Sequence, residues 1–262
     1  MTRMSVMTVA TLAVLSSLAG AAEVPIDLNT WSKRGPAAHG NWVVAADGAS
    51  VLQTINGNPT FFVSPANQFN TTLRGKIKVE QVGGDDDLIG FVFGFNGPVA
   101  NGTDMNFLLF DWKQGNQGPS LEGFALSRVN GNVPTADADP VFWARVDNPA
   151  FGFDNLATRY GPTEGWEDNV EYDFTMLYQE NRIKIDIAGG ALGLGQTIFD
   201  VAGVFSDGRF GFYNYSQQNV RYSGLTKEAT PPPPPSTPVP LPGTAMLAAL
   251  GLGLVAAQRK AR

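Results

Sequence analysis

The group of residues best suited to chemistry in this sequence is the run Asp85-Asp86-Asp87, which stands directly before a strand-like segment at 88–95. In an extended chain, Asp85 and Asp87 project to the same side, while Asp86 supplies a backbone carbonyl or points to solvent. Ca²⁺ binds six to eight such oxygen ligands, and a divalent ion also relieves the repulsion between adjacent carboxylates. The run predicts a calcium site. The alternative interpretation is a solvated acidic loop.

The segment after the acidic run has the pattern of a buried strand. Phe91, Phe93 and Phe95 recur at every second position and share one face, whereas Val92 and Gly94 fall on the other face. We therefore expect the three aspartates to lie at the end of a core strand, where the rest of the sheet holds them in place.

Period-2 patterns recur through much of the chain, and no convincing helical period is found between residues 23 and 228. Residues 130–157 are expected to form a loop, because three prolines there exclude a long central strand. This pattern predicts an all-β jelly-roll sandwich for 23–228. The expected strands are 50–55, 60–63, 72–82, 88–95, 106–113, 121–129, 171–179, 183–187, 210–215 and 220–226.

The N-terminal residues 1–22 have the composition of a secretory signal peptide. Arg3 precedes an apolar run at 6–15, and small residues follow as far as Ala21 and Ala22. This segment predicts a cleaved signal helix and an exported protein. A membrane anchor is the alternative, but the apolar run is short for a span.

The C-terminal residues have a different composition again. A proline-rich linker covers 229–238, and residues 239–262 combine a proline motif, an apolar helix at 244–257 and a basic end. The motif consists of Val239, Pro240, Leu241 and Pro242. A transient membrane anchor that is later cut, or a permanent single span, would explain this order of features.

Charge and cysteine content restrict the function of the domain at 23–228. This span holds all 24 acidic residues but only 14 of the 18 basic ones, so its net charge is −10. Such a surface repels phosphate backbones and anionic lipids and attracts cations, which excludes a nucleic-acid role. The chain has no cysteine. Bound calcium would replace the stabilisation that disulfides give many exported domains.

Catalytic patterns are missing from the sequence. Glycosidases on jelly rolls need two carboxylates flanking the scissile bond, typically in the pattern Glu-x-Asp-x-x-Glu, and that pattern is absent. The single histidine, His39, has no serine context, and no glycine-rich phosphate loop precedes a helix. We therefore expect a non-enzymatic protein.

Four motifs, in this order along the chain, resemble the thrombospondin C-terminal domain. They are Asp85-Asp86-Asp87-x-x-Gly90-Phe91-Val92-Phe93-Gly94, Trp112-Lys113-Gln114, Gly165-Trp166, and Gly208-Arg209-Phe210-Gly211-Phe212 with Ser216-Gln217. The resemblance spans roughly 28–226. It implies an L-type-lectin-like jelly roll that binds calcium and serves adhesion and matrix contacts. The calcium-binding repeats that precede this domain in animal thrombospondins are lacking, so their functions do not transfer.

The resemblance adds two candidate metal ligands. Phe110-Asp111-Trp112 is similar to the strand end where an aspartate meets the metal in L-type lectins, and Asn116 would be the asparagine that follows it, one residue later than the pattern expects. Asp111 could instead be an ordinary residue at a strand end. Five aromatic residues are candidates for stacking on sugars, but we expect most of them to fill the core. They are Trp112, Trp143, Trp166, Tyr213 and Tyr215.

The C-terminal segment resembles PEP-CTERM sorting signals of the variant that begins Val-Pro-Leu-Pro. This resemblance implies processing by an exosortase-type enzyme and delivery to a bacterial cell surface or its polysaccharide matrix. The sequence as a whole thus predicts an exported, calcium-binding adhesion or matrix protein that contacts extracellular polysaccharide. A lectin that reads a defined glycan is the alternative.

Overall fold

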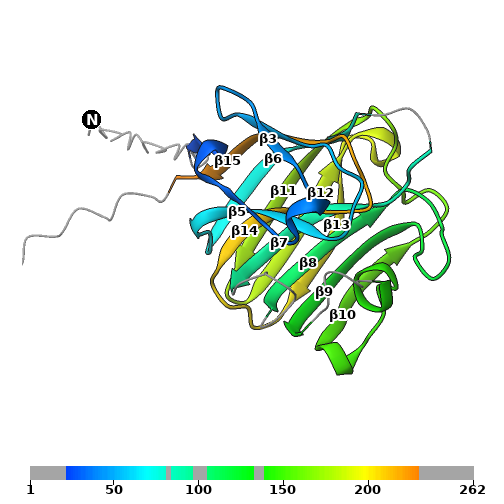
Figure 1. The fold of residues 1–262 in the computed structure, drawn as a ribbon. Helices are drawn as coiled ribbons and strands as arrows, with labels where there is room; N and C mark the ends of the chain where they lie inside the picture. Colours follow the sequence, from blue (N-terminus) through cyan, green and yellow to red (C-terminus); the bar gives the residue numbers. More distant parts are fainter. Residues whose placement is uncertain (1–21, 81–83, 97–104, 133–138, 230–262) are drawn as a thin grey trace, which may run out of the picture. The chain divides into compact units, whose positions relative to one another are not determined.

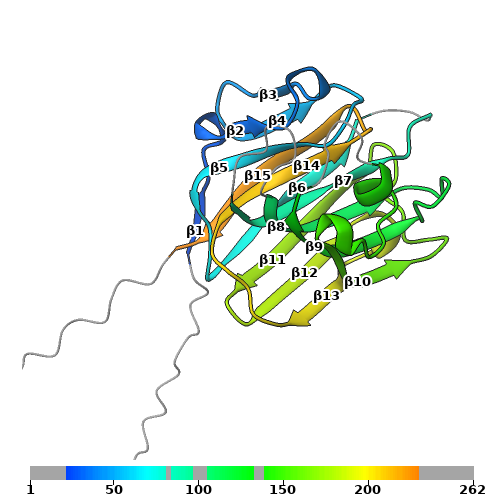
Figure 2. The same ribbon diagram turned by 60° about the horizontal axis from the view of Figure 1, so that its bottom comes forward.

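Two antiparallel β-sheets stacked face to face make up the part of the chain that the computed structural model describes (Figures 1 and 2). The described residues are 22–80, 84–96, 105–132 and 139–229. The predicted signal helix, the linker beyond Ala229 and the sorting motif at 239–242 lie outside them. Within the described ranges, no helix is long and apolar enough to span a membrane.

The first sheet has eight strands. In spatial order these are β13 (Gln196–Ala202), β12 (Arg182–Ala188), β11 (Glu171–Gln179), β6 (Thr71–Val79), β15 (Val220–Glu228), β4 (Ser50–Gln53) and β3 (Trp42–Val44), with β1 (Glu23–Pro25) also paired to β15. The pairs are all antiparallel.

The second sheet has seven strands and carries the acidic loop. Its order is β10 (Phe153–Tyr160), β9 (Gly123–Gly131), β8 (Met105–Lys113), β7 (Leu88–Asn96), β14 (Arg209–Tyr215), β5 (Thr60–Asn67) and β2 (Ser32–Arg34). The described helices are short: η1 (Leu28–Thr30), η2 (Ala37–His39), η3 (Asp139–Trp143), η4 (Pro149–Phe151) and η5 (Gly190–Leu192).

The alternating pattern at 171–187 forms the hairpin that the sequence predicts. β11 places Tyr172, Phe174, Met176 and Tyr178 inward, and β12 follows it in antiparallel register. The other face of this sheet is exposed to solvent, because the charged residues occupy the alternate positions along its strands. The all-β jelly-roll prediction is confirmed.

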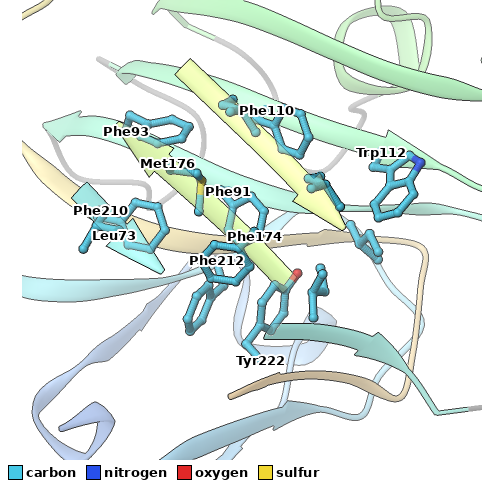
Figure 3. Packing of buried hydrophobic residues seen from close by; sticks show 14 of the residues in the cluster. Leu73, Phe91, Phe93, Phe110, Trp112, Phe174, Met176, Phe210, Phe212 and Tyr222 are labelled. Atoms are coloured by element: carbon cyan, nitrogen blue, oxygen red, sulfur yellow. The ribbon is translucent and has the colours of Figure 1, made fainter. Parts of the chain in front are cut away.

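The middle of the seven-stranded sheet is buried on both faces, which explains why β7 and β8 read as apolar almost throughout. On the inner face, the Phe91 ring lies 4.6 Å from the Phe174 ring of the opposite sheet and 5.7 Å from the Phe110 ring on β8, and Figure 3 shows this contact. A Cβ at Gly90 would come within 2.0 Å of the Phe110 carbonyl oxygen, so a glycine allows β7 and β8 to pair closely.

A second apolar cluster covers the outer face of the same sheet. Val141 and Phe142 of η3 and Phe153 of β10 pack there against Phe61 and Tyr213. The prediction of a loop through 130–157 was wrong at its end, because β10 begins at Phe153. Pro149 precedes that strand, and β10 lies at the edge of its sheet, so the prolines do not interrupt it.

Candidate functional site

A buried lysine lies at the centre of the acidic loop. β7 and β8 run antiparallel with Leu88 opposite Lys113, so the last residue of β8 meets the loop that precedes β7. The Lys113 side chain is fully buried. Its Nζ lies 2.8 Å from Asp86 Oδ1 and 3.0 Å from Asp87 Oδ1, and it also donates to the Asp86 carbonyl oxygen at 3.0 Å and to Gln117 Oε1 at 3.3 Å.

Backbone contacts hold the loop in this position. The Asp87 N–H donates to Gln217 Oε1 at 2.9 Å, and Trp166 Nε1 donates to the Asp87 carbonyl oxygen at 3.0 Å. The N–H of Gln114 donates to the Asp86 carbonyl oxygen at 3.1 Å. Three segments that are far apart in the sequence therefore fix the loop, and all three belong to motifs that the resemblance singled out.

Asp85 carries the loop's excess negative charge. It is half-buried and accepts a hydrogen bond from Asn56 Nδ2 at 2.8 Å. Burial raises the pKa of Asp85 to about 7, and the neighbouring carboxylates of Asp87 and then Asp86 add to the effect. A cation beside Asp85 would favour its ionised form at neutral pH.

The donor set fits calcium in part. When all three carboxylates are ionised, the single ammonium of Lys113 leaves the loop with a charge of −2, which one divalent ion would neutralise. Asp86 Oδ1 and Asp87 Oδ1 are engaged by Lys113, which leaves the Asp85 carboxylate beside Asp87 as the place for a hard cation. Within the described ranges, no three acidic, histidine or cysteine side chains are grouped closely enough to hold a metal by themselves. Carbonyl oxygens and water would have to complete the shell.

Asp111 lies in a separate buried ion pair. On β8 it stands opposite Gly90, and its Oδ1 lies 2.6 Å from Arg145 Nε, with both side chains almost inaccessible to solvent. Arg145 also donates to the carbonyl oxygens of Leu121 at 2.6 Å and Gly123 at 2.8 Å. Burial raises the pKa of Asp111 to about 6 although Arg145 acts to lower it.

Asn116 lies in a third environment. Its Oδ1 accepts from the Glu122 N–H at 2.8 Å, which fixes the turn between β8 and β9. The structure thus brings Asp85, Asp86 and Asp87 together, but it does not bring Asp111 or Asn116 to them. Their assignment as calcium ligands stays a prediction, and it would require Asp111 to exchange Arg145 for the metal.

The expectation that most candidate aromatic residues fill the core is confirmed. Trp112, Trp166, Tyr213 and Tyr215 are all buried, and Trp143 is half-buried beside Lys113 Nζ, which lies 4.8 Å from its ring centre. None of these residues is a fully exposed platform for a sugar ring.

The roles of Lys113 and Arg145 were missed by sequence reasoning. The role of Lys113 could have been predicted from the sequence. A lysine at the end of an apolar strand needs a counter-ion, and antiparallel pairing of that strand with the preceding one brings the aspartates to it. No sequence pattern predicted the role of Arg145, because this residue comes from an irregular segment whose position on the sheet is set by tertiary packing.

The comparisons with known proteins agree with this architecture. A family model described as the thrombospondin C-terminal region matches residues 37–127. Thrombospondin-3b of Danio rerio is 25% identical over 197 residues, and Thrombospondin-3 of Homo sapiens is 26% identical over 206 residues, each match covering 71% of this chain and 20% of the relative. The chain thus spans about a fifth of these relatives' length.

Solved structures share this fold. The VIP36 exoplasmic/lumenal domain in its Ca²⁺/Man-bound form superposes with a TM-score of 0.53 at 12% identity, over 79% of this chain and 85% of that one. A Bacillus subtilis protein with a galectin-like fold gives 0.50 at 12% identity, over 80% and 96%. The chain is therefore an L-type-lectin-like β-sandwich that is similar to the thrombospondin C-terminal region over residues 37–127.

Proposed function

We propose that this chain is an exported, non-catalytic matrix protein that binds calcium at its acidic loop and contacts extracellular polysaccharide or other matrix components. The observation that carries the proposal is a group of three carboxylates with a single ammonium, in which burial and the neighbouring Asp87 raise the pKa of Asp85 to about 7. Similarity to the thrombospondin C-terminal region supports a role of this kind.

In this proposal, Asp85 and Asp87 hold the ion, and Asp86 remains with Lys113. The bound ion supplies positive charge that lets both carboxylates stay ionised in a partly buried site. Because Gln217 and Trp166 hold the Asp87 backbone, an ion at this position links the loop before β7 to the segments after β10 and β14. Calcium would thus stabilise the folded domain without taking part in a reaction.

Adding calcium to the full-length protein at pH 8 is expected to raise its melting temperature. An ion present at a hundred times its Kd stabilises the folded state by about 2.7 kcal/mol, which is roughly 5–10 °C for a domain of this size. The shift is expected to be smaller at pH 6, because calcium must then displace the proton that Asp85 holds with its pKa of about 7. Differential scanning calorimetry with calcium and with chelator measures it.

Asp85→Asn is the sharpest variant for this experiment, because it removes a ligand and leaves both partners of Lys113 in place. It is expected to abolish the calcium shift, as is the double variant Asp86→Ala/Asp87→Ala, which also loses the contacts to Lys113. Asp154→Asn, at an exposed position on β10, is the matched control and should keep the full shift. If the melting temperature of the parent protein is the same with calcium and with chelator, the proposed site is refuted.

We also propose that the two ends direct the chain to a bacterial cell surface through a transient inner-membrane precursor. The order of proline motif, apolar stretch and basic end supports cleavage near Val239–Pro242 by an exosortase-type enzyme. Mass spectrometry of the protein recovered from the cell surface is expected to find a C-terminus close to that motif and an N-terminus near Ala22 or Glu23. Recovery of a chain that still ends at Arg262 would instead indicate a permanent anchor.

A lectin that reads a defined glycan is the second candidate. The observation that favours it is a polar cavity at the end of the sandwich opposite to the acidic loop, lined by asparagine and arginine side chains. The mannose-bound state of VIP36 gives a precedent for sugar binding on this fold.

A further inference from the structure

A cavity of about 240 Å³ lies at the end of the sandwich where β7 finishes and β8 begins. The inner faces of β8 and β9 form one wall, and Val204, Phe205 and Ser206, which connect β13 to β14, form the other. The acidic loop precedes Leu88 at the opposite end of β7, which is nine residues long. The cavity and the candidate calcium site are therefore separate.

Three polar side chains on adjacent strands line this cavity. Asn106 on β8 stands directly opposite Asn130 on β9, and the next pair with the same orientation is Leu108 opposite Arg128. Strand periodicity therefore puts both asparagines and the arginine on one face, within two residues of each other along each strand.

Arg128 differs from the other arginines of the described ranges. Each of the others donates a hydrogen bond or forms an ion pair, to a carboxylate or to a backbone carbonyl oxygen. Among the described residues, Arg128 contacts no acceptor, although it is half-buried. The side-chain amides of Asn106 and Asn130 likewise have no hydrogen-bond partner among the described residues. The side-chain donors and acceptors of all three residues therefore line the cavity.

The chemistry of these three side chains selects the ligand. A guanidinium group presents a planar fork of N–H donors that matches a carboxylate, and each asparagine amide offers both donors and an acceptor. Hydroxyl groups both donate and accept, so they suit asparagine amides, whereas a phosphate or a peptide carboxylate presents acceptors alone. A ligand with one carboxylate and neighbouring hydroxyls would use all three residues.

The lining and the volume of the cavity also favour a sugar as the ligand. Tyr178, Phe93 and Phe205 supply apolar and aromatic surface, and Val204 is exposed at the rim. Ligand pockets for drug-sized molecules measure roughly 300–1,000 Å³, so a cavity just below that range suits a single sugar ring. We propose that this cavity binds a uronate residue of an acidic polysaccharide. The inference rests on the polysaccharide contact proposed above and specifies its chemical class.

Calorimetric titration of the full-length protein with a galacturonate trisaccharide tests this assignment. The parent is expected to bind the trisaccharide and to lose roughly ten- to a hundredfold in affinity when its carboxylates are reduced to alcohols, because a charge-assisted bidentate contact disappears. Arg128→Gln should cause a loss of the same size for the acidic sugar only. Arg128→Lys should give an intermediate affinity, since lysine keeps the charge but not the fork.

Two further variants separate the cavity from general electrostatics. Asn106→Ala with Asn130→Ala is expected to weaken the acidic and the reduced trisaccharide alike, because hydroxyl contacts are lost in both. Arg182→Gln removes the same charge from an exposed arginine on β12 that pairs with Asp200, and it should leave binding unchanged. The melting temperature and calcium shift of each variant are measured together with binding, so unfolding is seen directly.

Three results would overturn the proposal: equal affinity for the acidic and the reduced trisaccharide, no change in Arg128→Gln, or preferential binding of an aspartate-rich peptide that competes with the sugar. A glycan panel distinguishes this failure from failure of the broader proposal. Binding to neutral polysaccharide alone would leave the matrix role standing and reject the uronate site, whereas a calcium-independent melting temperature would reject the metal site alone.

Discussion

Replacing Lys113 with methionine is expected to destabilise the domain by about 3–5 kcal/mol, which is the usual cost of removing one partner from a buried ion pair. Methionine has a similar length, so the change removes the charge and leaves most of the packing. The Asp87 side chain, which is only 6% exposed, would then carry an uncompensated charge beside Asp86. Urea denaturation at pH 7.5 measures the loss as a lower midpoint at unchanged slope.

Two companion variants identify the cause of this loss. Lys184→Met removes a lysine from the partly exposed pair with Asp186 and should cost less than about 1 kcal/mol. Lys113→Met combined with Asp87→Asn should be more stable than Lys113→Met alone, because the uncompensated buried charge is also gone; such non-additivity is typical of residues in contact. A loss of less than 1 kcal/mol in Lys113→Met would show that the ammonium does not hold the loop.

The same variant bears on the proposed calcium site. Without the ammonium, the loop charge changes from −2 to −3, so a divalent ion gains more from binding there. Lys113→Met is therefore expected to show a larger calcium-induced rise in melting temperature than the parent. A smaller rise would indicate that the lysine organises the ligands and does not compete with the ion.

Arg145→Met is expected to cost about 3–5 kcal/mol at pH 7.5 and clearly less at pH 5.5. Arg145 is the ion-pair partner of the buried Asp111 carboxylate, whose pKa is about 6 even with the arginine present. Without Arg145 that pKa rises further, so the folded variant takes up a proton as the pH falls. Two pH units are worth roughly 2 kcal/mol of regained stability relative to the parent, at 1.36 kcal/mol per unit for a fully protonating group.

The direction of this pH effect follows from proton linkage. A carboxyl whose pKa is raised by folding binds its proton more tightly in the native state, so its contribution to stability is greatest at low pH and is lost as the pH rises through the folded pKa. Chemical denaturation at both pH values checks it. An equal loss at pH 7.5 and 5.5 would mean that Asp111 stays ionised, and would contradict the assignment.

Arg221→Met is the matched control for Arg145→Met. Its partner Glu80 is part-exposed, and hydrogen bonds from Arg221 lower the pKa of Glu80. The stability from this pair is present above the ordinary pKa of a glutamate and is lost only when the pH falls below it. We therefore expect a cost below about 1 kcal/mol that does not change between pH 7.5 and 5.5.

Residue periodicity was sufficient to predict the sandwich. The hairpin from Glu171 to Ala188 alternates so regularly that its register could be read from the chain, because a one-residue slip would turn every apolar side chain to solvent. β10 and β13 escaped prediction, as did the three-residue strands β1, β2 and β3. β10 follows three prolines, and β13 has few buried residues, since it lies at the edge of its sheet.

The candidate calcium site was predictable in part. Asp85, Asp86 and Asp87 are consecutive, so the sequence alone determined that three carboxylates would crowd one loop at the start of a core strand. Tertiary structure decided what neutralises them. Lys113 reaches Asp86 from 27 residues away because β7 and β8 pair antiparallel. Asp111 lies two residues earlier on the same face of β8, and it pairs with Arg145 and not with the acidic loop.

The polar cavity depended on tertiary structure most of all. Neither asparagine nor Arg128 belongs to a motif, and each is ordinary in the sequence. Strand register aligns Asn106 with Asn130, and the segment that connects β13 to β14 packs opposite them to form the other wall of the cavity. Short-range order along a chain sets which residues share a face, because side chains alternate along every strand. Packing between segments that are far apart in the sequence decides which of these faces meet. It also decides which charged side chains are buried next to one another.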